Sequence, residues 1–165
     1  MIVNEGIGDK PTRVYKSLIN LKFLFSIICF LLILIIFQTY ENNIFAGLSM
    51  IAEYKDIEYK KAWKWVISSL ILFTIFLAFD LGIQITGLTY NFYKLNAINL
   101  SLKIFEVFLL VLYFLDSWHY ITIFYIFIFT QLICSSMEIY SLIFSVCSTF
   151  KKYNKIRNFE VKSKY

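Results

Sequence analysis

Four ionisable residues lie inside otherwise apolar stretches of the chain: Asp80, Lys103, Glu106 and Glu138. A charged side chain in the middle of a membrane-spanning helix costs about 2.5–3.5 kcal/mol on insertion scales, so such residues are rare. Two kinds of chemistry use them. They line a pathway for protons or ions, or they hold neighbouring helices together through buried polar contacts.

The spacing of these residues favours contacts between helices. Asp80 and Lys103 each lie about 8 Å inside the nearer end of their apolar runs, at about 1.5 Å per residue, so their side chains could pair. Lys103 and Glu106 are three residues apart and share a helix face. We therefore interpret the four residues as a polar clasp between helices, with the Lys103 ammonium group extending to the lipid headgroups. An ion or proton pathway is the alternative, but four charges without a second polar stripe make a poor conduit.

Glu138 lies far into the last apolar run and needs a polar partner or a proton. Lys103 and the hydroxyl groups of Ser or Thr are candidate partners, and Asp80 is one if the two carboxyl groups share a proton. The sequence predicts that Glu138→Gln keeps the fold because an amide can still form hydrogen bonds. Glu138→Leu should loosen helix packing by about 0.6–2 kcal/mol.

The only histidine, His119, has no catalytic surroundings in the sequence. It lies in a short polar segment near Asp116, without a Ser or Cys nucleophile in a recognisable motif. The cysteines, Cys29, Cys134 and Cys147, lack the spacing of a zinc site, and no phosphate-binding or dinucleotide-binding motif is present. We expect no catalytic residue, no metal site and no bound cofactor, and hence a protein that is not an enzyme.

The composition indicates that membrane-spanning helices carry these charges. Of the 165 residues, 59% are hydrophobic and 16% are charged, whereas soluble domains are about 45–50% apolar and about 25% charged. The apolar runs lack the two-residue alternation of strands, and four strands cannot close a membrane barrel. The predicted fold class is therefore all-α.

Four apolar runs predict a four-helix transmembrane bundle that forms a single domain over residues 1–165. A spanning helix needs about 20 residues, and the runs cover approximately residues 18–38, 63–85, 98–115 and 121–147. The third is a minimal span, while the fourth is long enough to tilt or to project beyond the bilayer. Residues 40–62 form the sizeable predicted loop. Residues 116–120 make the last two helices a tight hairpin.

The distribution of basic residues predicts that both termini are cytoplasmic. Lys and Arg residues near the membrane mark the cytoplasmic side. With four spans, the two terminal regions and the loop around Lys94 share one side and hold eleven basic residues, against four on the other side. The basic cytoplasmic tail, residues 148–165, includes Lys151, Lys152, Lys155 and Arg157. Such a tail is expected to meet anionic lipid, and we expect no nucleic-acid partner.

The loop and last helix resemble the transmembrane protein 107 family, small tetraspan proteins of the ciliary transition zone. Members carry an acidic residue two positions before a tryptophan, then a YIFxF run and a glutamate within the last helix. The matching residues here are Asp116, Trp118, Tyr125, Ile126, Phe127, Phe129 and Glu138. The second helix adds Asp80, where the family more often has Glu. A proline common in the family's last helix is absent, and Cys134 lies at about that place.

The resemblance implies a non-enzymatic role in the membrane complex that forms the diffusion barrier at the base of the cilium. Members of the family help to assemble that complex and thereby control which membrane proteins enter the cilium. The implied partners are other transition-zone membrane proteins and peripheral scaffold proteins. The alternative function is that of a small ion or solute transporter or channel subunit, with the intramembrane carboxylates as its site.

Overall fold

The computed structural model describes residues 13–48, 55–87, 89–90 and 92–162, and it describes side chains from residue 16 to residue 151 within these ranges, apart from residues 55 and 56. The described residues are helical, with no strand among them. The elements are α1 (Arg13–Gly47), α2 (Lys55–Thr86), α3 (Tyr93–Leu115), α4 (Thr122–Ile126), the π-helix η2 (Phe127–Leu132) and α5 (Ile133–Lys162). The prediction of an all-α fold is confirmed.

The prediction of four spans is also confirmed, since four helical stretches are long and apolar enough to cross a membrane. The first three are α1, α2 and α3. The fourth is the continuous helix made by α4, η2 and α5, because the residues at both junctions, Phe127 and Ile133, keep right-handed helical dihedral angles. Large apolar side chains are exposed along all four stretches, as expected where lipid replaces water around the bundle.

The helices continue further than the apolar runs predicted. Residues 40–62 were expected to form a loop, yet α1 continues to Gly47 and α2 begins at Lys55. Beyond the apolar runs the chain is less hydrophobic but still favours a helix. Glu, Lys and Ala are good helix formers, and no proline interrupts these segments. The fourth helix likewise continues to Lys162, so much of the expected tail is helical.

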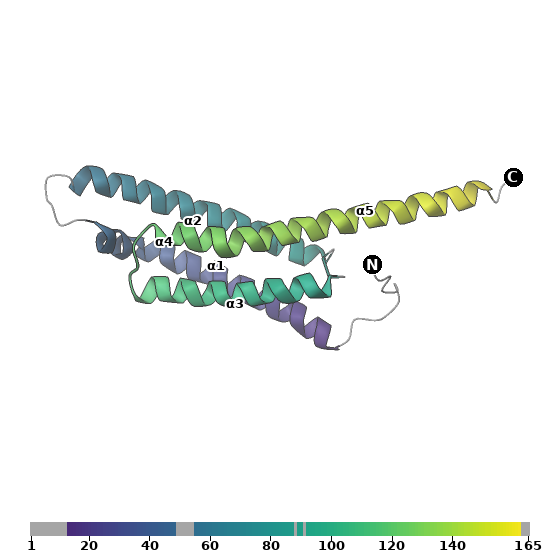
Figure 1. The fold of residues 1–165 in the computed structure, drawn as a ribbon, viewed down its shortest axis with the longest axis horizontal. Coiled ribbons are helices and arrows are strands. Elements are labelled where there is room, and N and C mark those ends of the chain that lie inside the picture. Colours follow the sequence, from purple (N-terminus) through teal and green to yellow (C-terminus); the bar gives the residue numbers. More distant parts are fainter. Residues whose placement is uncertain (1–12, 49–54, 88, 91, 163–165) are drawn as a thin grey trace.

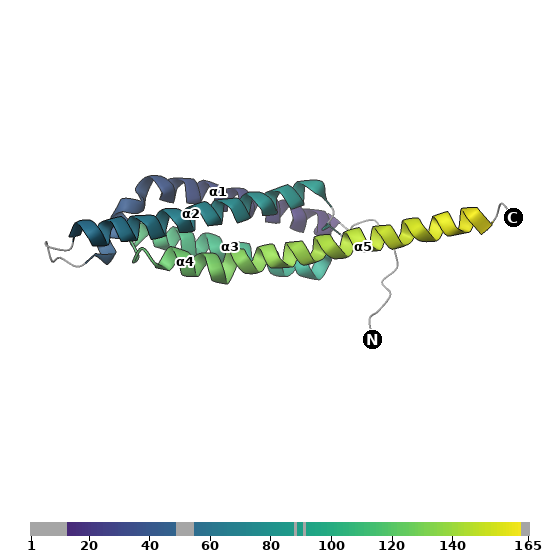
Figure 2. The same cartoon turned by 90° about the horizontal axis from the view of Figure 1, so that it is seen from above.

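The four spans form an antiparallel bundle in which α1 packs against α3 and α2, while the fourth span packs against α2 and α3. The start of α1 and the end of α5 lie at the same end of the bundle, which we name the terminal end (Figure 1). The opposite end, where α3 passes into α4, is named the hairpin end. The last turns of α5 project alone beyond the terminal end (Figure 2).

The interior of the bundle is polar toward the terminal end and mostly apolar toward the hairpin end, and the buried face of α3 shows this change. From the terminal end toward the hairpin end the buried stripe on this face runs through Asn96, Asn99, Lys103 and Glu106 and then through Leu110 and Tyr113. Its spacing of three and four residues keeps all six on one face. The hairpin half contains the larger part of the apolar core, formed by the buried side chains of Ile33, Ile36, Ile44, Val66, Leu70, Phe73, Leu110 and Ile123.

Candidate functional site

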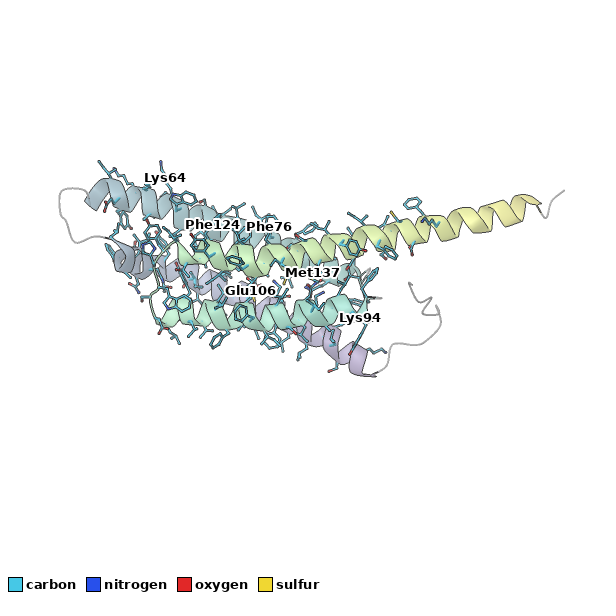
Figure 3. The ribbon with its side chains drawn as sticks, in the orientation of Figure 1. Lys64, Phe76, Lys94, Glu106, Phe124 and Met137 are labelled. Carbon is cyan, nitrogen blue, oxygen red and sulfur yellow. The ribbon has the colours of Figure 1, made fainter. Side chains whose placement is uncertain are left out.

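A buried ionic cluster lies near the middle of the bundle, and we name it the inner cluster. Lys103 of α3 lies 3.1 Å from Oε2 and 3.4 Å from Oε1 of Glu106, one helical turn further along. Asp80 of α2 lies 3.6 Å from the same ammonium group, through Oδ2. All three side chains are at most 1% exposed, and Glu106 points from α3 into the bundle (Figure 3). The structure brings Asp80, Lys103 and Glu106 into contact. The expectation that Lys103 extends to the headgroups is wrong, because its ammonium group is held inside the bundle by Asp80 and Glu106.

Gln131 of η2 connects the cluster to the fourth span. Its carbonyl oxygen accepts a hydrogen bond from Lys103, and its amide nitrogen donates to Asp80 Oδ2 at 2.6 Å and to Ser135 Oγ at 3.1 Å. An amide is suited to this place because it offers an acceptor to the cation and donors to the carboxyl group. Gln131 is uncharged and stands in an apolar run, so a search for charges missed it.

The π-helix itself carries functional information. Such segments are rare, occur mostly as single wide turns inside α-helices, and are frequent at functional sites. Here the six residues of η2 include Thr130 and Gln131, both fully buried. The irregular turn therefore coincides with the place where the fourth span joins the inner cluster.

A second ion pair, between Lys22 of α1 and Glu138 of α5, lies nearer the terminal end, and we name this region the end cluster. Lys22 donates hydrogen bonds to Glu138 and, at 2.8 Å, to Asn96 of α3. Asn99 donates to the same Glu138 oxygen at 2.8 Å, and Asn96 donates to the backbone carbonyl of Thr89 at 2.9 Å. The end cluster thus joins α1, α3 and α5.

The partner of Glu138 differs from the one expected. The sequence pointed to Lys103 or to hydroxyl groups, and Lys22 was counted with the basic residues that flank the membrane. The structure buries Lys22 to 3% exposure and pairs it with Glu138. A lysine at the edge of an apolar run usually extends to the headgroups, so its spacing gives no signal that it turns inward.

Hydrogen bonds from the end cluster also reach α2 through α1. Ser26 of α1 donates to the carbonyl of Lys22 at 3.0 Å, and Gln84 of α2 donates to Ser26 Oγ at 3.2 Å. The two clusters and this bridge include side chains from all four spans, and we refer to them together as the buried network. Contacts of this kind between membrane helices are worth about 0.6–2 kcal/mol each.

The ionic network ends partway along the bundle. Beyond Glu106, the next residues on the buried stripe of α3 are Leu110 and Tyr113, and both are fully buried. On α2 the corresponding buried positions are Leu77, Phe73 and Leu70. A path for ions across the membrane needs polar groups or water along its whole length. In the described residues the hairpin half is mostly apolar, with Asn43, Ser69 and the Tyr113 hydroxyl as isolated buried polar groups and no buried charge.

The residues that resembled the family motif divide between the core and the lipid-facing surface. Ile126 and Phe127 are buried, and Phe127 packs against Phe73 and Phe76 with ring centroids 5.7 and 5.5 Å apart. Tyr125 and Phe129 are 55% and 64% exposed. Trp118 packs against the core, whereas Asp116 is exposed at the end of α3. The motif residues therefore have structural positions. Some pack in the core of the bundle, and others lie on its outer surface.

The remaining candidate residues lie outside the ionic network. His119 stacks on Tyr120 at 4.4 Å and accepts a hydrogen bond from the backbone nitrogen of Ile121 at 3.3 Å. Lys151 is exposed on the projecting part of α5, while the side chains of Lys152, Lys155 and Arg157 lie outside the described side chains. Among the side chains that the structure describes, no three His, Cys, Asp or Glu residues gather as a metal-ligand set.

Asn43 of α1 is a buried residue that the sequence gave no reason to select. Its amide nitrogen donates at 3.0 Å to the carbonyl of Tyr113, in the last turn of α3, and at 3.0 Å to the carbonyl of Trp118. Carbonyl groups at a helix end lack partners within the helix. Asn43 therefore fixes the tight turn between the third and fourth spans to α1.

We expect Asn43→Ala to lower the free energy of unfolding by about 1–3 kcal/mol, because two carbonyl groups lose a buried donor. Thermal unfolding of the purified protein in detergent would measure the loss. Asn42→Ala is the matched control, since the neighbouring Asn42 is exposed. Equal stability of the two variants would contradict this role for Asn43.

Comparison with known proteins gives one family. The family model TMEM107, described as a transmembrane protein, matches residues 18–142. The matched region begins near the start of the first span and ends within α5, so it includes both clusters and the hairpin. No curated protein and no solved structure matches the chain.

Proposed function

The chain belongs to the TMEM107 family of transmembrane proteins, and we propose that this integral membrane protein is an assembly component of the ciliary transition zone. In that role it supports the diffusion barrier at the base of the cilium and so helps to set the protein composition of the ciliary membrane. Its partners are other transition-zone membrane proteins and peripheral scaffold proteins. It performs no catalysis and holds no cofactor.

The observation that carries this proposal is the use of the buried charges. Asp80, Lys103 and Glu106 contact one another, and Glu138 contacts Lys22. Asp80, Lys103 and Glu138 each pair with a residue of another helix, and Glu106 pairs with Lys103 within α3. This supports a rigid bundle that presents its outer faces to partners within the bilayer, as a component of an assembly must.

The alternative role as a transporter or channel subunit finds less support. The same carboxylates would form its ion site, but they meet an apolar region toward the hairpin end. A transporter of this kind would need that region to open during each cycle. The ion pairs favour one arrangement of the helices instead.

Removing the protein from ciliated cells tests the proposed function. Without it, we expect transition-zone membrane proteins to disperse from the base of the cilium, and plasma-membrane proteins to exchange with the ciliary membrane faster after photobleaching. Re-expression of the wild-type chain should restore both properties. Unchanged exchange and an intact transition zone after its removal would contradict the proposal.

The orientation of the bundle gives a separate prediction. The eleven basic residues on the terminal side predict that both chain ends are cytoplasmic. In the structure Lys94 lies at the terminal end and Lys64 at the hairpin end (Figure 3). Protease added to sealed vesicles with the cytoplasmic face outside should therefore remove tags from both ends of the chain. Protection of either tag would overturn this orientation.

The basic end of α5 is proposed to contact anionic lipid or a scaffold protein. Replacing Lys151, Lys152, Lys155 and Arg157 with Gln should weaken binding of the tail to anionic vesicles, by about 4 kcal/mol at most and by less at physiological ionic strength. The bundle should remain inserted, because these residues lie beyond residue 142, where the family match ends. Replacement of Lys60, Lys61 and Lys64 on α2 is the control. If vesicle binding and localisation are undiminished in this variant, the tail does not make these contacts and serves only as an orientation signal.

A further inference from the structure

The buried network has one more carboxyl group than it has cations. Asp80, Glu106 and Glu138 face two lysines, Lys22 and Lys103, and each of the five is at most 3% exposed. Among the side chains that the structure describes, these two lysines are the only buried cations. An ionised carboxylate without a counter-ion in a low-dielectric interior is costly, and such a group is neutralised by a proton. One of the three carboxyl groups should therefore be a neutral acid.

The contacts distinguish the three candidates. Glu138 has its own cation, Lys22. Glu106 presents both oxygens to Lys103, at 3.1 and 3.4 Å. Asp80 approaches Lys103 through one oxygen only, at 3.6 Å. Asp80 is therefore the carboxyl group with the weakest contact to a cation.

An independent observation identifies where the proton would lie. Two carboxyl oxygens, Asp80 Oδ1 and Glu138 Oε2, are buried, and no described group donates a hydrogen bond to either. Glu138 is paired with Lys22 through its other oxygen, which leaves Asp80 Oδ1 as the place for the proton. The side-chain oxygen of Gln84 is also a buried acceptor without a described donor. Residues four apart on a helix are neighbours on the same face. A proton on Oδ1 makes Asp80 a donor, and Gln84 supplies the acceptor one turn further along α2.

The polar and titratable groups around Asp80 come from α3 and from the fourth span. They are Lys103 and Glu106 of α3, Gln131 of η2, and Cys134, Ser135 and Glu138 of α5. Glu138 and Glu106 repel a negative charge on Asp80, and Lys103 is shared with Glu106. The two amides, Gln131 and Gln84, accommodate a neutral acid because each has both a donor and an acceptor.

We propose that Asp80 is a proton-binding site, held as a neutral carboxylic acid whose Oδ1–H donates to Gln84. The remaining charges then form two matched ion pairs, Lys103 with Glu106 and Lys22 with Glu138, and the buried network has no net charge. This protonation state does not depend on the ciliary role proposed above. It makes a specific statement about which carboxyl group can be replaced by an amide without loss.

Infrared spectroscopy of the protein in lipid nanodiscs at neutral pH tests the proposal. A protonated carboxyl group gives a C=O stretching band that is separate from the bands of carboxylates and amides and that shifts in heavy water. We expect one such band in the wild-type protein. It should be lost in Asp80→Asn and kept in Asp116→Asn, which changes an exposed carboxyl group at the end of α3. In Gln84→Leu it should move to higher frequency, because the acid loses its acceptor.

Each alternative gives a different result. A wild-type spectrum without the band would overturn the proposal and, with sodium-dependent stability, would indicate a bound cation in its place. A band that survives in Asp80→Asn would move the proton to Glu106 or Glu138. If Asp80→Asn does not fold, Gln84→Leu still tests whether the band comes from Asp80. A band at the same frequency in Gln84→Leu and in the wild type would overturn the proposal.

Discussion

Lys103→Met should prevent the bundle from forming a stable native state. Among the described side chains, Lys103 is the one cation in contact with Glu106, and all of its hydrogen-bonding partners are buried. Removing one member of a buried ion pair leaves the other charge uncompensated and costs about 3–5 kcal/mol. Gln131 also loses the donor to its carbonyl oxygen. The measurement is the free energy of unfolding in detergent or, if no native state remains, the yield of monodisperse protein.

Two further variants separate this effect from a general loss of lysine. Lys94→Met, on the exposed surface of the same helix, should leave stability within about 0.5 kcal/mol of the wild type. Lys103→Met combined with Glu106→Gln removes both charges and should recover most of the loss. If the single variant is as stable as Lys94→Met, the inner cluster does not stabilise the bundle.

Glu138→Gln should destabilise the protein by about 3–5 kcal/mol, more than the sequence alone predicted. The earlier expectation of tolerance rested on the ability of an amide to form hydrogen bonds and did not count the loss of charge beside a buried cation. Because the partner is Lys22, which is 3% exposed, an amide leaves a buried ammonium group without its counter-ion. Glu138→Leu should be at least as damaging for the same reason.

A double-mutant cycle measures this pair. Lys22→Met and Glu138→Leu together replace both charges with apolar side chains of similar length, so the double variant should be more stable than either single variant. Lys16→Met, an exposed lysine on the same helix, is the control. Additive losses in the double variant would show that the two residues act independently and would contradict the end cluster.

The number of spans could be predicted because it depends on local properties of the chain. Runs of about 20 apolar residues are recognisable wherever they pack, and the four runs became four spans. Asp80, Lys103 and Glu106 were also recognisable, since a charge in an apolar run is conspicuous. Their spacing along α2 and α3 was sufficient to place them at similar depth.

The partners of these charges could not be predicted in the same way. Lys22 stands at the edge of the first run, where position along the chain does not say whether a lysine faces headgroups or the interior. Gln131 and Asn43 are neutral, and nothing in their neighbours marks them as buried donors. The π-helix at Phe127–Leu132 is a property of how the fourth span packs on α2 and α3. Each of these depends on the arrangement of four helices.

The helix bounds were missed for a different reason. Apolar runs define how much of a helix lies in lipid, and helices end where backbone geometry changes. α2 ends at Thr86, and the following Gly87 has a φ of 70°, in the left-handed region that favours glycine. The sequence of α5 has no such residue before Lys162, so the helix continues past the end of its apolar part.

The central claim is that this bundle serves as an assembly component at the base of the cilium. The most direct measurement is the position of the fluorescently tagged wild-type chain in ciliated cells, expressed at its natural level and compared with a marker of the transition zone. The account predicts a ring at the base of the cilium that coincides with the marker. A uniform signal over the plasma membrane or an internal organelle, with none concentrated at the ciliary base, would contradict it.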